Sequence, residues 1–251
     1  MTRESWLKAH PYLQSIADLQ AIVDRALALV QVPAAAIPSF DNYREDFYAG
    51  IPLLDSASAA VDVTEASQAT ERMMTRLAQE PLPVSLAAQC TARDEGLVRY
   101  IGSTVLSRHL AAVVSAFGQW RDEDRWLRNH CPTCGGLPAM AQLSGSDPGR
   151  QRLLSCGCCR TRWRYRRASC PFCEAQENEH QQRVVAIEGD AAVRIDHCGA
   201  CRAYIKTYVG DGDEQLMLAD WTSLHLDVLA KQRGLERLAA SLFELPVITA
   251  S

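Results

Sequence analysis

Four Cys-x-x-Cys pairs lie between residues 131 and 201 of this 251-residue chain. They are Cys131 and Cys134, Cys156 and Cys159, Cys170 and Cys173, and Cys198 and Cys201. A turn of this kind can hold two thiolates about 2.3 Å from one metal ion, and two such turns complete a tetrahedral four-sulfur shell. The first two pairs are separated by 21 residues and the last two by 24, near the usual spacing of tetracysteine metal sites. The pattern predicts two metal ions per chain, each held by four thiolates.

An internal repeat of about 40 residues indicates how the pairs combine. Each copy runs cysteine pair, hairpin, cysteine pair, and then an arginine and an aromatic-rich strand, at residues 159–165 in the first copy and 201–208 in the second. We therefore expect the first pair to share an ion with the second, and the third with the fourth. A cross-brace of the first pair with the third is the less favoured alternative.

The two remaining cysteines and two nearby histidines are not expected to be metal ligands. In the run Cys156-Gly-Cys-Cys159 the outer two cysteines have ligand spacing, so Cys158 is the spare thiol, and Cys90 stands alone. His130 and His197 each directly precede a cysteine pair and could replace a thiolate. Because eight cysteines already fill two sites, we expect these histidines to support the ligands or lie on the surface.

Each repeat is predicted to form a hairpin between its two cysteine pairs. The expected strands, each pair joined by a turn rich in glycine and polar residues, are 139–143 with 151–155 and 182–187 with 193–197. Such a unit has too little apolar surface to fold alone, and structural zinc contributes on the order of 10–16 kcal/mol in finger peptides. The metal is therefore expected to stabilise each unit.

A basic segment follows the second cysteine pair. Arg160, Arg162, Arg164 and Arg166 alternate with Thr161, Trp163 and Tyr165, so a strand would place the guanidinium groups on one face and the aromatic rings on the other. These arginines are candidates for binding an acidic protein partner. The alternatives are a solvated strand whose charge balances the thiolates, and a surface for phosphate or nucleic acid.

The residues before the cysteines predict an all-α bundle. Apolar residues recur at helical spacing in 14–32, 56–80 and 96–120, with a loop and one short helix in 34–55. Residues 1–128 contain no group of residues whose types and spacing suggest catalysis. Composition changes near residue 128, so the predicted domains are an α-helical domain at 1–128, a first metal unit at 129–168, and a second metal unit with a C-terminal helix near 215–233 at 169–251.

Charge and composition exclude several classes. The formal net charge of −4 divides into −4 for residues 1–128, +4 for 129–209 and −4 for 210–251, which argues against a general nucleic-acid binder. With 22% charged and 47% hydrophobic residues the composition is that of a globular protein. The sequence lacks both a long apolar run and the apolar core of a secretory signal at its start, so we expect a cytoplasmic protein with reduced thiols.

The cysteine motifs resemble those of the formate dehydrogenase accessory protein family (FdhE-like). The resemblance is carried by Cys131-Pro-Thr-Cys-Gly-Gly-Leu-Pro138, Ser155-Cys-Gly-Cys-Cys-Arg-Thr-Arg-Trp163, Cys170-Pro-Phe-Cys-Glu174 and Asp196-His-Cys-Gly-Ala-Cys-Arg-Ala-Tyr-Ile-Lys206. Leu218-Ala-Asp220 and Leu224-His-Leu-Asp-Val-Leu229 extend it. It covers about 129–235 and is specific there, whereas in 1–128 only the helical character is shared.

The resemblance implies an α+β fold, with an N-terminal all-α bundle followed by two tandem rubredoxin-like (zinc-ribbon-like) metal units and a C-terminal helix. It also implies a cytoplasmic maturation factor that contacts the catalytic subunit of molybdenum- or tungsten-dependent formate dehydrogenases and has no turnover of its own. The implied metal is iron, although tetrathiolate sites also accept zinc. A homodimer is compatible with the sequence.

Two other functions compete with this one. Rubredoxin-like tetrathiolate iron could make the chain an electron carrier, and a zinc-ribbon surface could bind nucleic acid, which the charge distribution disfavours. Dithiol exchange is not favoured because no thioredoxin-like βαβ pattern surrounds the cysteine pairs. Eight thiolates in two full shells leave no open coordination position for metal-dependent hydrolysis.

Overall fold

The computed structural model describes residues 7–8, 11, 14–79, 95–146, 149–175, 183–185, 192–239 and 241. Residues 188–190, in the turn predicted between the strands 182–187 and 193–197, and Cys90 lie outside these residues. The chain divides into two compact units. The first contains residues up to Ala36 together with Asp62–Ala112, and the second contains Ile37–Val61 together with Val113–Phe243.

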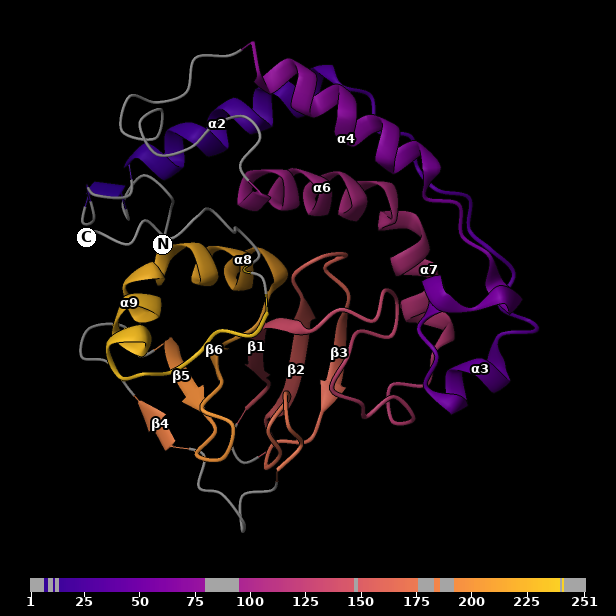
Figure 1. Cartoon of the computed structure of the whole chain (residues 1–251). Helices are drawn as coiled ribbons and strands as arrows, with labels where there is room; N and C mark the ends of the chain where they lie inside the picture. The colour runs from indigo at the N-terminus through magenta and orange to yellow at the C-terminus, as the bar shows by residue number, and fades with distance from the viewer. Residues whose placement is uncertain are drawn as a thin grey trace. The chain divides into compact units, whose positions relative to one another are not determined.

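The first unit is helical, as the periodicity predicted. Its helices are α2 (Gln14–Leu29), α4 (Thr64–Leu77) and α6 (Glu95–His109), shown in Figure 1. Each presents a buried apolar stripe, with Val23, Met73 and Ile101 inaccessible to solvent. None of the helices that the structure describes combines the length and apolar character needed to cross a bilayer.

The single helix expected at 96–120 is instead two helices, α6 and α7 (Ala111–Trp120), that meet at Leu110. In a continuous helix the carbonyl of His109 would accept a hydrogen bond from the amide four residues later. Here that carbonyl accepts a bond of 2.8 Å from the amide of Ala35. A hydrogen bond from a residue distant in the sequence therefore interrupts the helix that the periodicity predicted.

Part of the segment assigned to the helical domain folds with the cysteine-rich region. Residues 37–61 form α3 (Arg44–Ala49) and two 3₁₀ turns, η2 (Leu53–Asp55) and η3 (Ala57–Ala59). The amides of Leu53 and Leu54 each donate a 2.9 Å hydrogen bond to the turn of the first cysteine pair, at the carbonyls of Pro132 and Thr133. The predicted boundaries at 128 and 168 remain predictions about separately folding domains.

An aromatic cluster fixes this segment in place. Tyr43 and Phe47 make edge or tilted contacts with Phe117 and Trp120, at ring-centroid distances of 5.6–6.1 Å. Phe47 also stacks on Trp126, at 5.2 Å. Burying large rings in such contacts contributes about 0.5–1.5 kcal/mol per pair beyond the area buried. Residues 37–61 and 113–126 are therefore anchored beside the first cysteine pair.

The two repeats form one six-stranded sheet (Figure 1). Its strands are β1 (Pro138–Ser144), β2 (Gln151–Cys156), β3 (Arg162–Tyr165), β4 (Arg183–Val185), β5 (Val193–His197) and β6 (Tyr204–Val209), in the order β3-β2-β1-β6-β5-β4. All neighbours are antiparallel except the central pair, β1 with β6, which is parallel. The predicted α+β fold with two ribbon-like units is confirmed, and the parallel pair joins the units into one sheet.

The parallel pair also places both cysteine groups at the same end of the sheet. β1 begins soon after the first cysteine pair and β6 begins soon after the fourth, and the two strands run in the same direction. The first group lies at the ends of β1 and β2, and the second lies at the ends of β5 and β6. The sheet therefore carries two separate sites and not one shared cluster.

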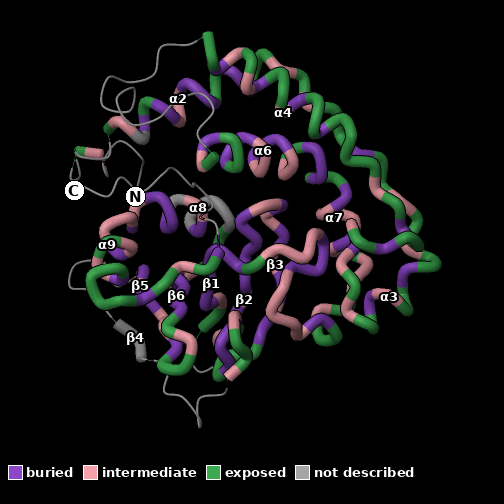
Figure 2. Tube along the Cα trace, viewed as in Figure 1, coloured by how far each residue is buried: buried purple, intermediate pink, exposed green. Residues whose placement is uncertain are grey.

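Helices α8 (Asp213–Thr222) and α9 (Leu224–Gln232) lie beside β1, β6 and β5, where the single helix 215–233 was expected (Figure 1). Buried residues of both helices and the sheet form one core: Ala139, Met140, Val193, Ile195, Tyr204, Leu216, Ala219, Leu226, Ala230 and Leu235. Figure 2 shows that β1 and β6 are buried along most of their length. The break at Ser223 is a correction to the sequence-based helix.

The break has a physical reason. In a continuous helix, Asp220 and Asp227 would stand about 10 Å apart along the axis, at 1.5 Å per residue. In the structure both carboxylates contact the ammonium group of Lys206, at 2.7 and 2.8 Å. The turn between α8 and α9 brings the two acids to one buried cation.

Candidate metal centres

The structure gathers the eight cysteines into two groups of four. One group contains Cys131, Cys134, Cys156 and Cys159, and the other contains Cys170, Cys173, Cys198 and Cys201. Within each group all four Sγ atoms lie within 4.8 Å of one another. Each group joins consecutive pairs along the chain, first with second and third with fourth.

The sulfur spacing fits a tetrahedral thiolate shell. In the first group Cys131 Sγ lies 3.4 Å from Cys159 Sγ, and Cys134 Sγ lies 3.4 Å from Cys156 Sγ. The corresponding distances in the second group are both 3.7 Å. Four sulfurs about 2.3 Å from one ion would be about 3.7–3.8 Å apart, whereas disulfide sulfurs are about 2.05 Å apart. Each group could hold one zinc or iron ion.

One backbone conformation builds all four cysteine turns. In each, the amide of the first cysteine donates a 2.9 Å hydrogen bond to the carbonyl five residues later: Cys131 to Gly136, Cys156 to Thr161, Cys170 to Ala175, and Cys198 to Ala203. Amides inside three of the turns also point at sulfur, with N···S distances of 3.3–3.4 Å from Thr133, Cys158 and Phe172. These donors would stabilise thiolate charge.

The residue after each turn adopts a left-handed conformation. The φ angles are +72° at Gly135, +63° at Arg160, +61° at Glu174 and +62° at Arg202. Among the residues that the structure describes, Arg160, Glu174 and Arg202 are the non-glycine residues with a positive φ angle. A left-handed conformation costs a residue with a side chain roughly 1–2 kcal/mol. The turns therefore impose a local strain that metal binding and sheet pairing must offset.

Replacing Gly135 by alanine tests this conformation. A Cβ there would meet unfavourable φ and lie 3.2 Å from Pro52 Cγ, so we expect the free energy of unfolding to fall by about 1–2 kcal/mol. The same replacement at Gly118 in α7, where nothing lies within 4 Å of the added atom, should raise stability by about 0.5–1 kcal/mol. Urea unfolding of the metal-loaded protein measures both. Equal effects would show that Gly135 has no special conformational role.

The two groups differ in exposure. In the first group Cys131, Cys156 and Cys159 are buried, whereas in the second Cys173 is exposed. Burial raises the pKa of the Cys131 and Cys170 thiols above the ordinary value, because a thiolate there is removed from water. A bound cation would favour the thiolate forms. The second site is the more accessible one to a chelator or a partner.

The other candidate ligands that the structure describes lie outside these two groups of four. Cys158 lies outside the first group of four, and Cys90 lies outside the described residues. The ring of His130 lies near two oxygens, 3.2 Å from the carbonyl of Gly50 and 3.3 Å from the side chain of Asn129. His197 is the last residue of β5. Neither histidine belongs to a four-sulfur group.

The basic strand has the predicted alternation but not four equivalent arginines. Trp163 and Tyr165 are buried, and Arg162 and Arg164 point to the other face of β3. Arg162 contacts Gln142, and Arg164 pairs with Asp124. Two further arginines flank the strand: Arg160, which contacts Met217 Sδ at 3.0 Å, and Arg166, which is exposed. A partner contact at these four residues remains a proposal.

A buried ion cluster beside the sheet was missed by sequence reasoning. Lys206 and Asp220 are almost inaccessible to solvent, and Arg237 contacts Asp220 at 3.1 Å and Asp227 at 2.9 Å. The hydroxyl of Tyr204 donates to Asp227 at 2.7 Å. The sequence feature that could have revealed the cluster is the position of Lys206 between Tyr204 and Tyr208. Residues two apart on a strand share a face, so Lys206 lies on the same face as two aromatic rings. The cluster ties β6 to both C-terminal helices.

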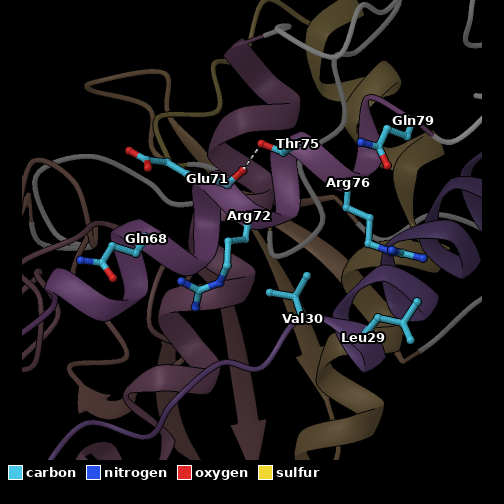
Figure 3. Close-up of a pocket in the computed structure, with 8 residues that line it drawn as sticks. All are labelled: Leu29, Val30, Gln68, Glu71, Arg72, Thr75, Arg76 and Gln79. Carbon is cyan, nitrogen blue, oxygen red and sulfur yellow. Dashed lines mark hydrogen bonds between the residues drawn. The ribbon is translucent and has the colours of Figure 1, made fainter.

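The helical unit contains a hollow of about 610 Å³ (Figure 3). Leu29 and Val30 at the end of α2 line it together with polar residues of α4, among them Glu71, Arg72 and Arg76. Arg72 donates a 3.2 Å hydrogen bond to the carbonyl of Gln31. Its lining residues carry charges of both signs, and it opens widely to solvent. The lining therefore does not indicate which class of ligand would bind.

The geometry can be compared with known proteins. No protein-family model matches the chain. The protein FdhE of Salmonella choleraesuis (strain SC-B67) is 31% identical over 145 residues, which are 56% of this chain and 46% of that protein. The protein FdhE of Salmonella newport (strain SL254) is 30% identical over the same shares. The chain thus spans about half the length of the curated relatives it matches.

The likeness of fold extends further. The crystal structure of the FdhE protein from Pseudomonas aeruginosa matches with a TM-score of 0.64 and 21% sequence identity, and the match covers 96% of this chain and 93% of that one. The match therefore extends over nearly all of the chain drawn in Figure 1. As its cysteine motifs predicted, the chain is similar to FdhE proteins, in sequence over 145 residues and in fold over nearly its whole length.

Proposed function

We propose that this protein is a cytoplasmic accessory factor needed to bring a formate dehydrogenase to its active state. In this role it binds the catalytic subunit of the immature enzyme and has no turnover of its own. The observation that carries the proposal is the pair of tetracysteine groups at one end of a shared sheet, in a chain that is FdhE-like. All eight cysteines serve as metal ligands, four to each ion.

The donor set supports a tetrathiolate ion at each site, with iron or zinc as the metal. The residues fit such an ion, because the sulfur separations of 3.4–3.7 Å match its shell and amides point at three of the sulfurs. When bound, the ion supplies cross-links between chain segments and, if it is iron, a one-electron couple. The chain's own residues fix the turns, cover the first site and leave Cys173 of the second site exposed.

The exposed position of Cys173 favours a second candidate function, that of a rubredoxin-like electron carrier. An exposed ligand lets a redox partner approach the ion closely. The two functions differ in what the host loses when the protein is absent: an accessory factor is needed to make active formate dehydrogenase, whereas a carrier is needed only for electron flow during turnover.

Deletion and complementation test the proposal. We expect deletion to lower formate dehydrogenase activity at least tenfold, measured in extracts with an artificial electron acceptor, while the catalytic polypeptide is still made. The wild-type chain should restore the activity and Cys170→Ser should not, because an incomplete shell loosens the surface that binds the partner. Cys158→Ser, which leaves both groups of four intact, is the matched control.

The contact surface can be examined in the same strain. Arg164→Glu with Arg166→Glu inverts the charge of the proposed partner contact, so capture of the catalytic subunit should fall while metal content holds. Normal capture would place the contact elsewhere on the chain. Full formate dehydrogenase activity in the deletion strain would contradict the accessory function itself, and a defect seen only with the physiological acceptor would favour the electron carrier.

A further inference from the structure

A second hollow, of about 440 Å³, opens beside the edge strand β3, and five arginines line it. They are Arg150, Arg152, Arg164, Arg166 and Arg167, and we call this site the arginine hollow. None of the described residues that line it is acidic. Its volume falls within the range of small-molecule sites, about 300–1,000 Å³.

The positive charge of the arginine hollow is only partly neutralised. Asp124 pairs with Arg164 at the rim, and the charges of Asp211 and Asp196 act on Arg150 and Arg152. Arg167 donates a 3.3 Å hydrogen bond to the backbone carbonyl of Arg150, which fixes its side chain without compensating its charge. Arg166 and Arg167 are both exposed. By contrast, the hollow of Figure 3 has Glu71 among its arginines, so excess charge distinguishes the arginine hollow.

Arg152 forms the inner wall and is only 4% exposed. Its Nη1 donates a 2.9 Å hydrogen bond to the carbonyl of Ser169, whereas Nε and Nη2 have no hydrogen-bond partner among the described residues. Both atoms are buried, so Arg152 contributes to the arginine hollow mainly its positive charge. Arg152 also shares with Asp196 a cavity with room for about one water molecule.

We propose that the arginine hollow binds the phosphate group of a small molecule. A carboxylate carries one negative charge, whereas a phosphate monoester carries about −1.5 to −2 at pH 7 and offers three acceptor oxygens. Several guanidinium groups around one hollow match the larger charge, and their planar forks match phosphate geometry. The inference goes beyond the proposed function and does not depend on it.

Calorimetric titration of the full metal-loaded chain with inorganic phosphate, pyrophosphate and adenosine monophosphate tests the proposal. At low ionic strength we expect one phosphate site per chain, with affinity falling as salt is added. Arg150→Gln and Arg167→Gln should each weaken binding about tenfold through loss of a charge-assisted hydrogen bond. Neither arginine belongs to the proposed partner contact or the cysteine groups, so metal content should stay at two per chain.

Arg125→Gln is the matched control. Arg125 is exposed, lies 3.8 Å from Asp122 and does not line the arginine hollow, so its loss should change affinity less than twofold. Tighter binding of adenosine monophosphate than of inorganic phosphate would identify an organic ligand, and equal binding a free phosphate; both support the proposal. Absence of saturable binding, an equal loss in Arg125→Gln, or binding of oligoglutamate alone would overturn it.

Discussion

Replacing Cys159 by serine is expected to lower the bound metal from two ions per chain to one, while replacing Cys158 leaves it at two. Cys159 is 2% exposed, and its sulfur lies 3.4 Å from that of Cys131 in the first group of four. Serine cannot supply a thiolate, and metal-binding free energy is folding free energy in such units, on the order of 10–16 kcal/mol for structural zinc in finger peptides. The loss of one ligand should therefore both release the ion and loosen the turns around it.

Elemental analysis of the two purified variants measures this directly. Cys158→Ser makes the same change of sulfur to oxygen at the neighbouring residue, but Cys158 lies outside the group of four. The two variants thus differ in whether the removed sulfur belongs to the shell. Loss of metal from both, or from Cys158→Ser alone, would show that the ligand in the Cys-Gly-Cys-Cys run had been misassigned.

Replacing Asp220 by asparagine is expected to reduce the free energy of unfolding by about 3–5 kcal/mol at pH 7, because removing one member of a buried ion cluster leaves uncompensated charge. Lys206 lies 2.7 Å and Arg237 lies 3.1 Å from the same oxygen of Asp220. Asparagine keeps the shape and removes the charge. Denaturant unfolding of the metal-loaded protein measures the difference. Asp122→Asn, at an exposed ion pair, should cost less than about 0.5 kcal/mol.

The stability that the Asp220 carboxylate contributes should depend on pH, and the direction of that dependence follows from the pKa of the carboxyl group. Burial alone would raise the pKa of Asp220, but the charges of Lys206 and Arg237 outweigh it and hold that pKa below the ordinary value. The ionised carboxylate therefore contributes stability that is fully present above the pKa of the unfolded chain, near 4, and is lost as the pH falls toward the folded-state pKa. The gap between wild type and Asp220→Asn should shrink below about pH 4. A gap that stays constant would mean that the charge of Asp220 does not stabilise the fold.

The sequence predicted the parts of this fold that depend on local pattern. Turn spacing and the tandem repeat indicated which cysteines would combine, and the structure gathers them in those groups. Alternation in β3 correctly placed Trp163 and Tyr165 on one face, which the structure shows to be buried. The left-handed residues could also have been found, because Arg160, Glu174 and Arg202 occupy the place that Gly135 holds in the first turn.

Features that depend on distant contacts could not be predicted. The parallel pairing of β1 with β6 joins the first strand of one repeat to the last strand of the other, and no local signal specifies it. Residues 37–61 have loop-like composition, yet their aromatic contacts and hydrogen bonds place them against the first cysteine turn. The break at Ser223 serves the buried Lys206, whose partners are 14 and 21 residues away.

We propose that the eight cysteines form two separate tetrathiolate metal sites, on which the proposed function depends. Metal analysis combined with X-ray absorption of the anaerobically purified protein tests it most directly. We expect two ions per chain, each surrounded by four sulfurs at about 2.3 Å, with no second metal ion at the distance found in a cluster. A nitrogen or oxygen ligand in the shell, a metal–metal vector, or cysteines oxidised to disulfides in a metal-free chain would contradict it.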